Sequence, residues 1–428
     1  MKIFSLVFIL IFFVSCGENI SKKQNNRNKI AQKKTSTTSE KLYESYQAKN
    51  KNLSNVVFIA LDAHADTKLA ISNLRWSAEN YGFNLIALKN VENNDPQYQQ
   101  HIQKGLSQAI NDLDIKPTKL FLIGFSGGAR MALNYAQHHK ADGVIMLGAG
   151  PRKQNKEFSF PLAMVSGTQD FNFSEQYYPI NSQQIFNPNL MTLHWRGKHE
   201  WPDSSIIDEA VSFILYASST IIEKDINRKS QLERAKQAQQ ENNLFFYFKE
   251  LELIFKTSTG DIHDKTQQSI KDIRKSGKAI QYFNRFNKSL VNEQKRKQVY
   301  IKDLDEKPMD WWKQAIENMD NMIASEDNIL ADSYARSKAF MGILLYSKTS
   351  AAISGRGNAK LLPKYLEIYQ LIEPQNPDLF YFKAKYAYAL SDNDGTIENL
   401  KRAIKYGFND DEKLHQSFPQ IIISAAKK

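Results

Sequence analysis

Residues 119–131 read Lys119-Leu-Phe-Leu-Ile-Gly-Phe-Ser-Gly-Gly-Ala-Arg-Met131, and this stretch decides the fold. Its first five residues form a short, mostly apolar run that suits a buried strand, and the residues from Gly128 onward have the spacing of an amphipathic helix. Between them the residues Gly124-Phe-Ser-Gly-Gly128 leave room only for a sharp turn, with Ser126 at its centre. Gly124 and Gly128 lack side chains, so strand and helix can pass closely. The stretch therefore predicts a strand, a sharp turn and a helix in that order.

Similar short apolar runs lie on both sides of this stretch. They occupy residues 55–61, 83–88, 143–147, 162–165 and 190–195. Stretches with helical spacing separate them, at residues 69–81, 98–113, 128–138 and 204–216. Buried strands that alternate with helices predict an α/β fold with a doubly wound, mostly parallel sheet. Ligands of such sheets bind at the carboxyl ends of the strands, so polar residues just after those ends are the candidates for function.

Three polar residues follow the ends of three predicted strands. Ser126 follows the strand at 119–123, Asp170 comes shortly after the strand at 162–165, and His199 comes after the strand at 190–195. A serine hydroxyl is a poor nucleophile at neutral pH, so it needs a base, and that base needs an acid to orient it. We therefore predict Ser126 as nucleophile, His199 as base and Asp170 as the orienting acid. Glu200 and Asp203 are alternative acids.

The order strand, G-x-S-x-G, helix, then acid, then histidine resembles the α/β-hydrolase superfamily. Within it, the runs G-F-S-G-G-A-R and G-K-H-E-W look most like small, lidless carboxylesterase and dienelactone-hydrolase-like members, and like hydrolase lipoproteins of the Bacteroidetes type. The resemblance covers residues 53–217 and implies a carboxylesterase-like serine hydrolase acting on a small ester or related acyl substrate. Little chain separates Ser126 from Asp170, so no cap domain fits and the pocket should be open and shallow.

An acyl-transfer site also needs donors that stabilise the oxyanion. The resemblance implies the backbone N–H of Gly127 as one donor and an N–H from the loop after the first predicted strand, either Ala63 or His64, as the other. That loop reads Asp62-Ala-His-Ala-Asp66, where many relatives have His-Gly. The same run could be taken for metal ligands, but no second cluster at ligand spacing accompanies it. The prediction therefore includes no metal and no organic cofactor.

The first residues predict export. Residues 3–14 are apolar and too few to cross a hydrocarbon core, which needs about 20 residues in a helix, and Ser15-Cys16-Gly17 follow directly. Residues 1–15 therefore read as a signal peptide. Cys16 is the single cysteine, and its position resembles the lipobox of bacterial lipoproteins, although Phe13 stands where leucine is preferred. We expect a lipidated, membrane-anchored protein of the cell envelope, on its periplasmic or cell-surface side; a plain cleaved signal with an unmodified cysteine is the alternative.

Residues 16–52 are polar and rich in lysine, which predicts a disordered tether behind the lipid. Its positive charge would attract anionic lipid headgroups or serve solubility. The whole chain carries a formal net charge of +11, and much of that excess lies in the tether. Basic and acidic residues nearly balance elsewhere, so the sequence indicates no nucleic-acid partner.

Residues 218–428 change to long helical runs, with a polar run at 221–241 that suits a helical linker. Near the end, a helix–turn–helix pattern resembles the tetratricopeptide repeat. The residues that carry this resemblance are Asn376-Pro377-Asp378, Ala384, Tyr388, Gly395 and Ala403. The resemblance implies a peptide or protein partner, although helices that only brace the hydrolase are the alternative. A second reading of the whole chain is therefore a catalytically idle hydrolase fold that acts as an envelope binding or scaffold protein.

Overall fold

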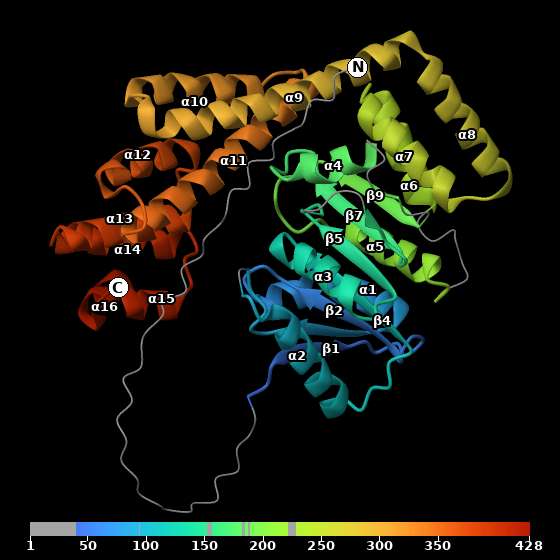
Figure 1. Cartoon of the computed structure of the whole chain (residues 1–428), viewed down its shortest axis with the longest axis horizontal. Coiled ribbons are helices and arrows are strands. Elements are labelled where there is room, and N and C mark those ends of the chain that lie inside the picture. Colours follow the sequence, from blue (N-terminus) through green and yellow to red (C-terminus); the bar gives the residue numbers. More distant parts are fainter. Residues whose placement is uncertain (1–39, 94, 152–155, 182–184, 187–188, 221–227) are drawn as a thin grey trace, which may run out of the picture. The chain divides into compact units, whose positions relative to one another are not determined.

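The computed structural model describes residues 40–428 apart from 94, 152–155, 182–184, 187–188 and 221–227 (Figure 1). The predicted signal peptide, the lipidation of Cys16 and the tether up to residue 39 lie outside the described residues. In the part of the chain that is described, no helix is both long enough and apolar enough to cross a bilayer.

A mixed sheet forms the centre of the first part of the chain. In the described residues it has seven strands in the order β1-β3-β2-β4-β5-β7-β9. Their bounds are β1 Tyr43–Gln47, β2 Val56–Leu61, β3 Asn84–Leu88, β4 Lys119–Phe125, β5 Gly143–Leu147, β7 Leu162–Gly167 and β9 Leu190–Trp195. The pairs from β3 through β2, β4 and β5 to β7 are parallel, whereas β1 runs antiparallel to β3. The predicted α/β class, with a mostly parallel sheet and a helical part after it, is confirmed.

Helices cover both faces of this sheet because its strands are apolar on both faces. Val57, Ile59 and Leu61 of β2 join one core cluster, and the alternate residues of the same strand join the other, as the two-residue period of a strand requires. The first cluster includes residues of α2 (Tyr98–Asp112) and α3 (Gly127–His138). The second includes residues of α1 (Thr67–Tyr81) and α5 (Ser204–Ala217).

Strand β1 shortens the predicted tether. Tyr43 pairs with Leu88 across the antiparallel ladder, its side chain is buried, and its hydroxyl donates to Asp112 at 3.2 Å. The tether predicted for residues 16–52 therefore ends before residue 43. The polar composition of this segment was misleading because a strand at the edge of a sheet needs few apolar side chains: the ladder satisfies its backbone, and Tyr43 fills the gap beside Leu88.

Helix α7 (Leu244–Thr257) packs beside β9, and α6 (Arg228–Gln240) packs against α7, so α6 is more than a linker. Arg228 is buried and donates to the carbonyl oxygens of Ile254 and Thr257, near the end of α7. Arg234 pairs with the buried carboxylates of Glu209 and Glu250. The linker prediction for this polar run is therefore wrong for residues 228–240, because charges that find partners can be buried.

The remaining elements in the described residues are mostly helices. The remaining elements are α4 Phe173–Asn181, α8 Gly260–Lys275, α9 Gly277–Glu306, α10 Met309–Ile323, α11 Asn328–Ile353, η1 Ala359–Leu361, α12 Leu362–Ile372, α13 Pro377–Ala389, α14 Asn393–Lys405, α15 Asp411–Ser417 and α16 Gln420–Ala426, with a small parallel pair β6 Lys156–Glu157 and β8 Ile185–Phe186. Trp312 is fully buried in the core of these last helices.

The repeat-like pattern near the end falls on α13 and α14. Ala384 and Ala403 are buried there, whereas Tyr388 is 39% exposed. Gly395 lies in the first turn of α14 rather than in the connection, and its N–H donates to the capping Asp392. The tetratricopeptide resemblance and a peptide partner for these helices stay predictions.

Two compact units make up the chain. The first contains the described residues up to Ser166 together with 175–195 and 200–267. The second contains Gly167–Ser174, Arg196–His199 and Gln268–Lys428. Two short loops, one following β7 and one following β9, thus belong to the same compact unit as the helices from α9 onward. We name residues 167–174 the acid loop and residues 196–199 the histidine loop.

Candidate active site

Ser126 occupies a strained turn between β4 and α3. Strand β4 ends at Phe125 and α3 begins at Gly127, and Ser126 between them has φ 53° and ψ −117°. Residues other than glycine rarely adopt such a backbone conformation, and it persists only where the surrounding structure imposes it. The N–H of Ser126 donates to the carbonyl oxygen of Leu147 at 2.8 Å, which ties the turn to β5.

The glycines on either side of Ser126 allow this turn to form. A Cβ atom added at Gly124 would lie 2.3 Å from the backbone of Gly128. One added at Gly128 would lie 2.1 Å from the carbonyl oxygen of Leu61, at the end of β2. Neither approach leaves room for a side chain, so the G-x-S-x-G spacing has a steric cause in this chain.

The loop after β2 is shaped by its two aspartates. Asp62 Oδ1 accepts hydrogen bonds from the N–H groups of His64, at 2.8 Å, and Asp66, at 3.4 Å. Asp66 in turn caps α1 by accepting from the N–H of Leu69 at 2.9 Å. Both carboxylates therefore serve backbone donors. In the part of the chain that the structure covers, no group of three or more His, Cys, Asp or Glu side chains is arranged to hold a metal ion.

Gly127 is buried at the start of α3, beside the side chain of Asn93. A Cβ atom at Gly127 would lie 1.6 Å from Asn93 Oδ1. The N–H of Asn93 donates to the carbonyl oxygen of Ala63 at 3.0 Å, so the loops after β2 and β3 are joined. Asn93 was not among the residues predicted from the sequence. The available signal was its position shortly after the end of β3, where ligand-binding residues gather in such folds.

Asp170 and His199 are directly hydrogen-bonded. The two carboxylate oxygens of Asp170 lie 2.9 and 3.0 Å from Nδ1 of His199. The Asp170 side chain is 1% exposed and that of His199 is 17% exposed. The N–H of Asn172 also donates to Asp170 Oδ1 at 2.8 Å, and the ring of Phe171 lies 4.3 Å from that of His199. A buried carboxylate with these partners can hold the imidazole in one orientation.

The acid loop and the histidine loop are in backbone contact. The N–H of Gln169 donates to the carbonyl oxygen of Gly197 at 2.9 Å. A Cβ atom at Gly167 would lie 2.2 Å from that same oxygen. The absence of a side chain at Gly167 thus permits the approach that brings Asp170 to His199.

The predicted site residues divide between the two units. Ser126, Gly127, Ala63 and His64 belong to the first unit, and the pair Asp170–His199 belongs to the second. The alternative acid Asp203 lies at the N-cap of α5.

His194, in β9, is a buried strand residue. Its Nδ1 lies 3.0 Å from Ser166 Oγ. Burial first, and then the charge of Lys249, lower the pKa of His194 to about 3. A neutral, buried imidazole of this kind has a structural role.

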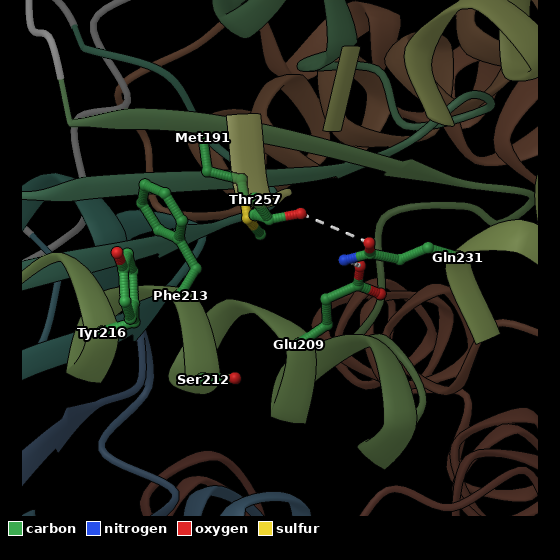
Figure 2. A pocket seen from close by; sticks show the side chains of 7 residues that line it. All are labelled: Met191, Glu209, Ser212, Phe213, Tyr216, Gln231 and Thr257. Carbon is green, nitrogen blue, oxygen red and sulfur yellow. Dashed lines mark hydrogen bonds between the residues drawn. The ribbon is translucent and has the colours of Figure 1, made fainter. Parts of the chain in front are cut away.

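A small cavity in the first unit is lined by none of the predicted site residues (Figure 2). Its volume is about 20 Å³, which is room for about one water molecule. Thr257 donates to Gln231 at 3.3 Å, and Gln231 donates to Glu209 at 2.8 Å along its wall. The cavity is too small for an acyl substrate. Its lining residues are Met191, Glu209, Ser212, Phe213, Tyr216, Gln231 and Thr257.

No family model matches the chain, and no curated protein matches it. Among solved structures, an esterase from Pyrococcus furiosus aligns at 14% identity, over 46% of this chain and 100% of that chain, with a TM-score of 0.31. An alpha-beta serine hydrolase homologue from Coxiella burnetii aligns at 14% identity, over 40% and 89% of the two chains, with a TM-score of 0.32. Est1E from Butyrivibrio proteoclasticus aligns at 13% identity, over 42% and 94%, with a TM-score of 0.33. Identities this low say nothing about activity or substrate.

Proposed function

We propose that this chain is a serine hydrolase of the carboxylesterase-like kind, which cleaves an ester or related acyl bond. The observation that carries the proposal is the strained conformation of Ser126 in a turn from strand to helix. Strain of this kind is kept at functional sites and has no evident use in a turn that only connects two elements. The hydrogen-bonded pair Asp170–His199 supplies the other two groups that a serine nucleophile needs.

Each residue has a defined role in the proposed reaction. Ser126 Oγ attacks the acyl carbon while His199 Nε2 takes up the hydroxyl proton. His199 then gives this proton to the departing alcohol, and an acyl-enzyme ester remains on Ser126. Water, deprotonated by His199, hydrolyses that ester and restores the serine. Asp170 keeps Nδ1 protonated throughout, so that Nε2 is the ring nitrogen that exchanges the proton.

The backbone N–H of Gly127 is the first proposed oxyanion donor. We assign the second to Ala63 rather than His64, because the N–H of His64 already donates to Asp62. Removal of one such donor typically lowers the rate by about 100- to 1000-fold.

Ester hydrolysis and active-site labelling test the proposal together. Purified protein without residues 1–15 should hydrolyse short-chain p-nitrophenyl esters and react with a fluorophosphonate probe, and Ser126→Ala should abolish both. Ser166→Ala is the matched control, since Ser166 also lies beside a histidine but is buried. Labelling that survives Ser126→Ala, or that is lost only in Ser166→Ala, would reject the assignment.

We also propose that Cys16 carries the lipid that anchors the enzyme to the cell envelope. Support comes from the apolar run before this single cysteine. Cys16→Ser should abolish incorporation of labelled fatty acid and move the protein from the membrane to the soluble fraction. Unchanged incorporation in the variant would rule out this anchor.

A further inference from the structure

The backbone of the acid loop is bound by two cations, one on each side of Asp170. Arg336, in α11, donates through Nη1 to the carbonyl oxygen of Thr168. Lys297, in α9, donates through Nζ to the carbonyl oxygen of Phe171 at 3.2 Å. These carbonyls stand two residues before and one residue after Asp170. Charged donors make stronger hydrogen bonds than neutral ones, so both ends of this short segment are firmly held.

A buried carboxylate joins the two cations. Glu293, in α9, accepts from Lys297 Nζ at 2.7 Å and from Arg336 Nε at 2.7 Å. The side chains of Glu293, Lys297 and Arg336 are 0%, 7% and 1% exposed. Burial alone would raise the pKa of the Glu293 carboxyl, but Arg336 and Lys297 outweigh it and hold that pKa below its usual range. The three side chains therefore form one charged cluster, which we name the Glu293 cluster.

Further contacts from the same helices reach both ends of the acid loop. Gln169 donates to Asp332, in α11, at 3.0 Å, and Gln294, in α9, donates to Ser174 at 3.0 Å. The guanidinium of Arg336 also lies 4.9 Å from the centre of the Phe173 ring, which is fully buried. Every one of these contacts joins α9 or α11 to the segment that carries the proposed catalytic acid.

Packing alone does not require this arrangement. Buried ion pairs cost desolvation, and apolar residues of similar size often stabilise a fold as well or better. What a charged cluster adds is direction, because its donors can bind particular backbone oxygens. Here the donors of Arg336 and Lys297 bind the carbonyls that flank Asp170.

We propose that Arg336 and Lys297, joined by Glu293, are positioning residues that hold the acid loop so that Asp170 stays within hydrogen-bond distance of His199. The C-terminal helices are then part of the catalytic apparatus rather than a separate module. This inference rests on the proposed function for its catalytic consequence, whereas its structural part can be tested without activity.

Kinetics of Arg336→Met test the catalytic part. We expect kcat for a p-nitrophenyl ester to fall about 100-fold, as for a displacement of about 1 Å in a catalytic group, with little change in KM. The fall in kcat should be smaller in Arg336→Lys, because lysine keeps a positive charge beside Glu293. Lys297→Met provides a second variant in which Glu293 remains paired with Arg336, in case Arg336→Met fails to fold.

Arg296→Met is the matched control. Arg296 also joins α9 to α11, by donating to Ser333 and Ser337 and by stacking on Tyr334. Its loss should weaken the same pair of helices without freeing the acid loop. Equal losses of kcat in Arg296→Met and Arg336→Met would show that only general stability is involved and would overturn the proposal.

A double mutant separates positioning through Asp170 from other effects. In an Asp170→Asn background, Arg336→Met should cause little further loss of kcat, because the residue through which it acts has already been changed. If the fold-losses of kcat in Asp170→Asn and Arg336→Met instead multiply in the double mutant, the proposal is overturned.

Hydrogen–deuterium exchange tests the structural part in protein of any activity. Amides of residues 167–174 should exchange at least about 10-fold faster in Arg336→Met than in wild-type protein, and at the wild-type rate in Arg296→Met. Unchanged exchange in Arg336→Met would overturn the proposal. A wild-type protein without esterase activity or labelling would instead reject the proposed function, and the exchange result would still decide whether the Glu293 cluster holds the loop.

Discussion

Nδ1 of His199 faces both carboxylate oxygens of Asp170, at 2.9 and 3.0 Å, and the carboxylate is almost completely buried. An anionic partner at Nδ1 favours the tautomer that carries its proton there. The other ring nitrogen, Nε2, is then the one that can accept a proton. This geometry is the one that the proposed reaction requires of the imidazole.

Asp170→Asn should reduce kcat for ester hydrolysis by about 10,000-fold, because an amide can present its N–H to Nδ1 and stabilise the wrong tautomer. The change is nearly isosteric, so the melting temperature should shift far less than after a loss of packing. Asp203→Asn is the control, since Asp203 lies at the N-cap of α5. Steady-state kinetics of both variants check this expectation, and a larger loss in Asp203→Asn would assign the acid to that residue instead.

Gly167→Ala should lower both stability and activity. The new Cβ would lie 2.2 Å from the carbonyl oxygen of Gly197, and because that atom is backbone, the acid loop and the histidine loop must move apart. Overpacking of this kind typically costs about 1–3 kcal/mol. Urea unfolding and kcat measure the two effects. In Gly277→Ala, by contrast, the added Cβ meets no atom within 4 Å, so that variant should match or exceed the wild-type stability.

Asp62→Ala should loosen the loop that carries Ala63. Asp62 accepts from the N–H of His64, and loss of this acceptor should cost about 1 kcal/mol of stability and reduce kcat as well. Asp62→Asn keeps an acceptor oxygen, so its stability and kcat should lie between those of Asp62→Ala and the wild-type protein. Asp66→Ala removes the cap of α1, and should cost about 1 kcal/mol with a smaller effect on kcat. If the two alanine variants lose kcat equally, Asp62 has no special role in the loop.

The pH dependence of stability should include a contribution from His194. Its pKa in the folded protein is about 3, below the ordinary 6.5. As pH falls from about 6.5 towards 3, the unfolded chain therefore binds a proton that the folded chain does not, and stability is lost at up to about 1.4 kcal/mol per pH unit.

His194→Asn removes this titration. The variant should be less stable than wild-type protein at pH 7, because packing is lost, but its free energy of unfolding should fall less steeply between pH 6 and pH 4. Urea unfolding at several pH values measures both slopes. Parallel curves for the two proteins would contradict the assigned shift.

Local sequence patterns predicted the parts of this molecule that local physics determines. Every residue of β2 is buried, and such an apolar run is recognisable without knowledge of its neighbours. The turn at Ser126 depends on glycines only two residues away on each side, so its geometry could also be predicted from the local sequence. The pairing of Asp170 with His199 agrees with the expected chain order, because parallel strands end at one edge of a sheet. The assignment of a triad stays a prediction.

Long-range contacts account for what sequence analysis missed. Strand β1 owes its existence to the ladder with β3 and to the fit of Tyr43, and its own composition is polar. The charges of Arg336 and Glu293 look, in sequence, like those of any solvent-facing helix. Thr168, whose carbonyl oxygen accepts from Arg336, lies 168 residues before it in the sequence. Only the folded chain shows that these charges are buried and what they bind.

The division of the chain into compact units bears on how the protein can be produced and divided into fragments for assays. A fragment that stops at Ala217 would keep the proposed nucleophile, Ser126, and every strand of the main sheet, yet it would lack the helices against which residues 167–174 and 196–199 are packed. We expect such a fragment to lack esterase activity even if it folds, because Asp170 and His199 would no longer be held in place. The smallest polypeptide worth expressing for assays therefore extends past α11, and random truncation from the C-terminus should abolish turnover well before it reaches the sheet.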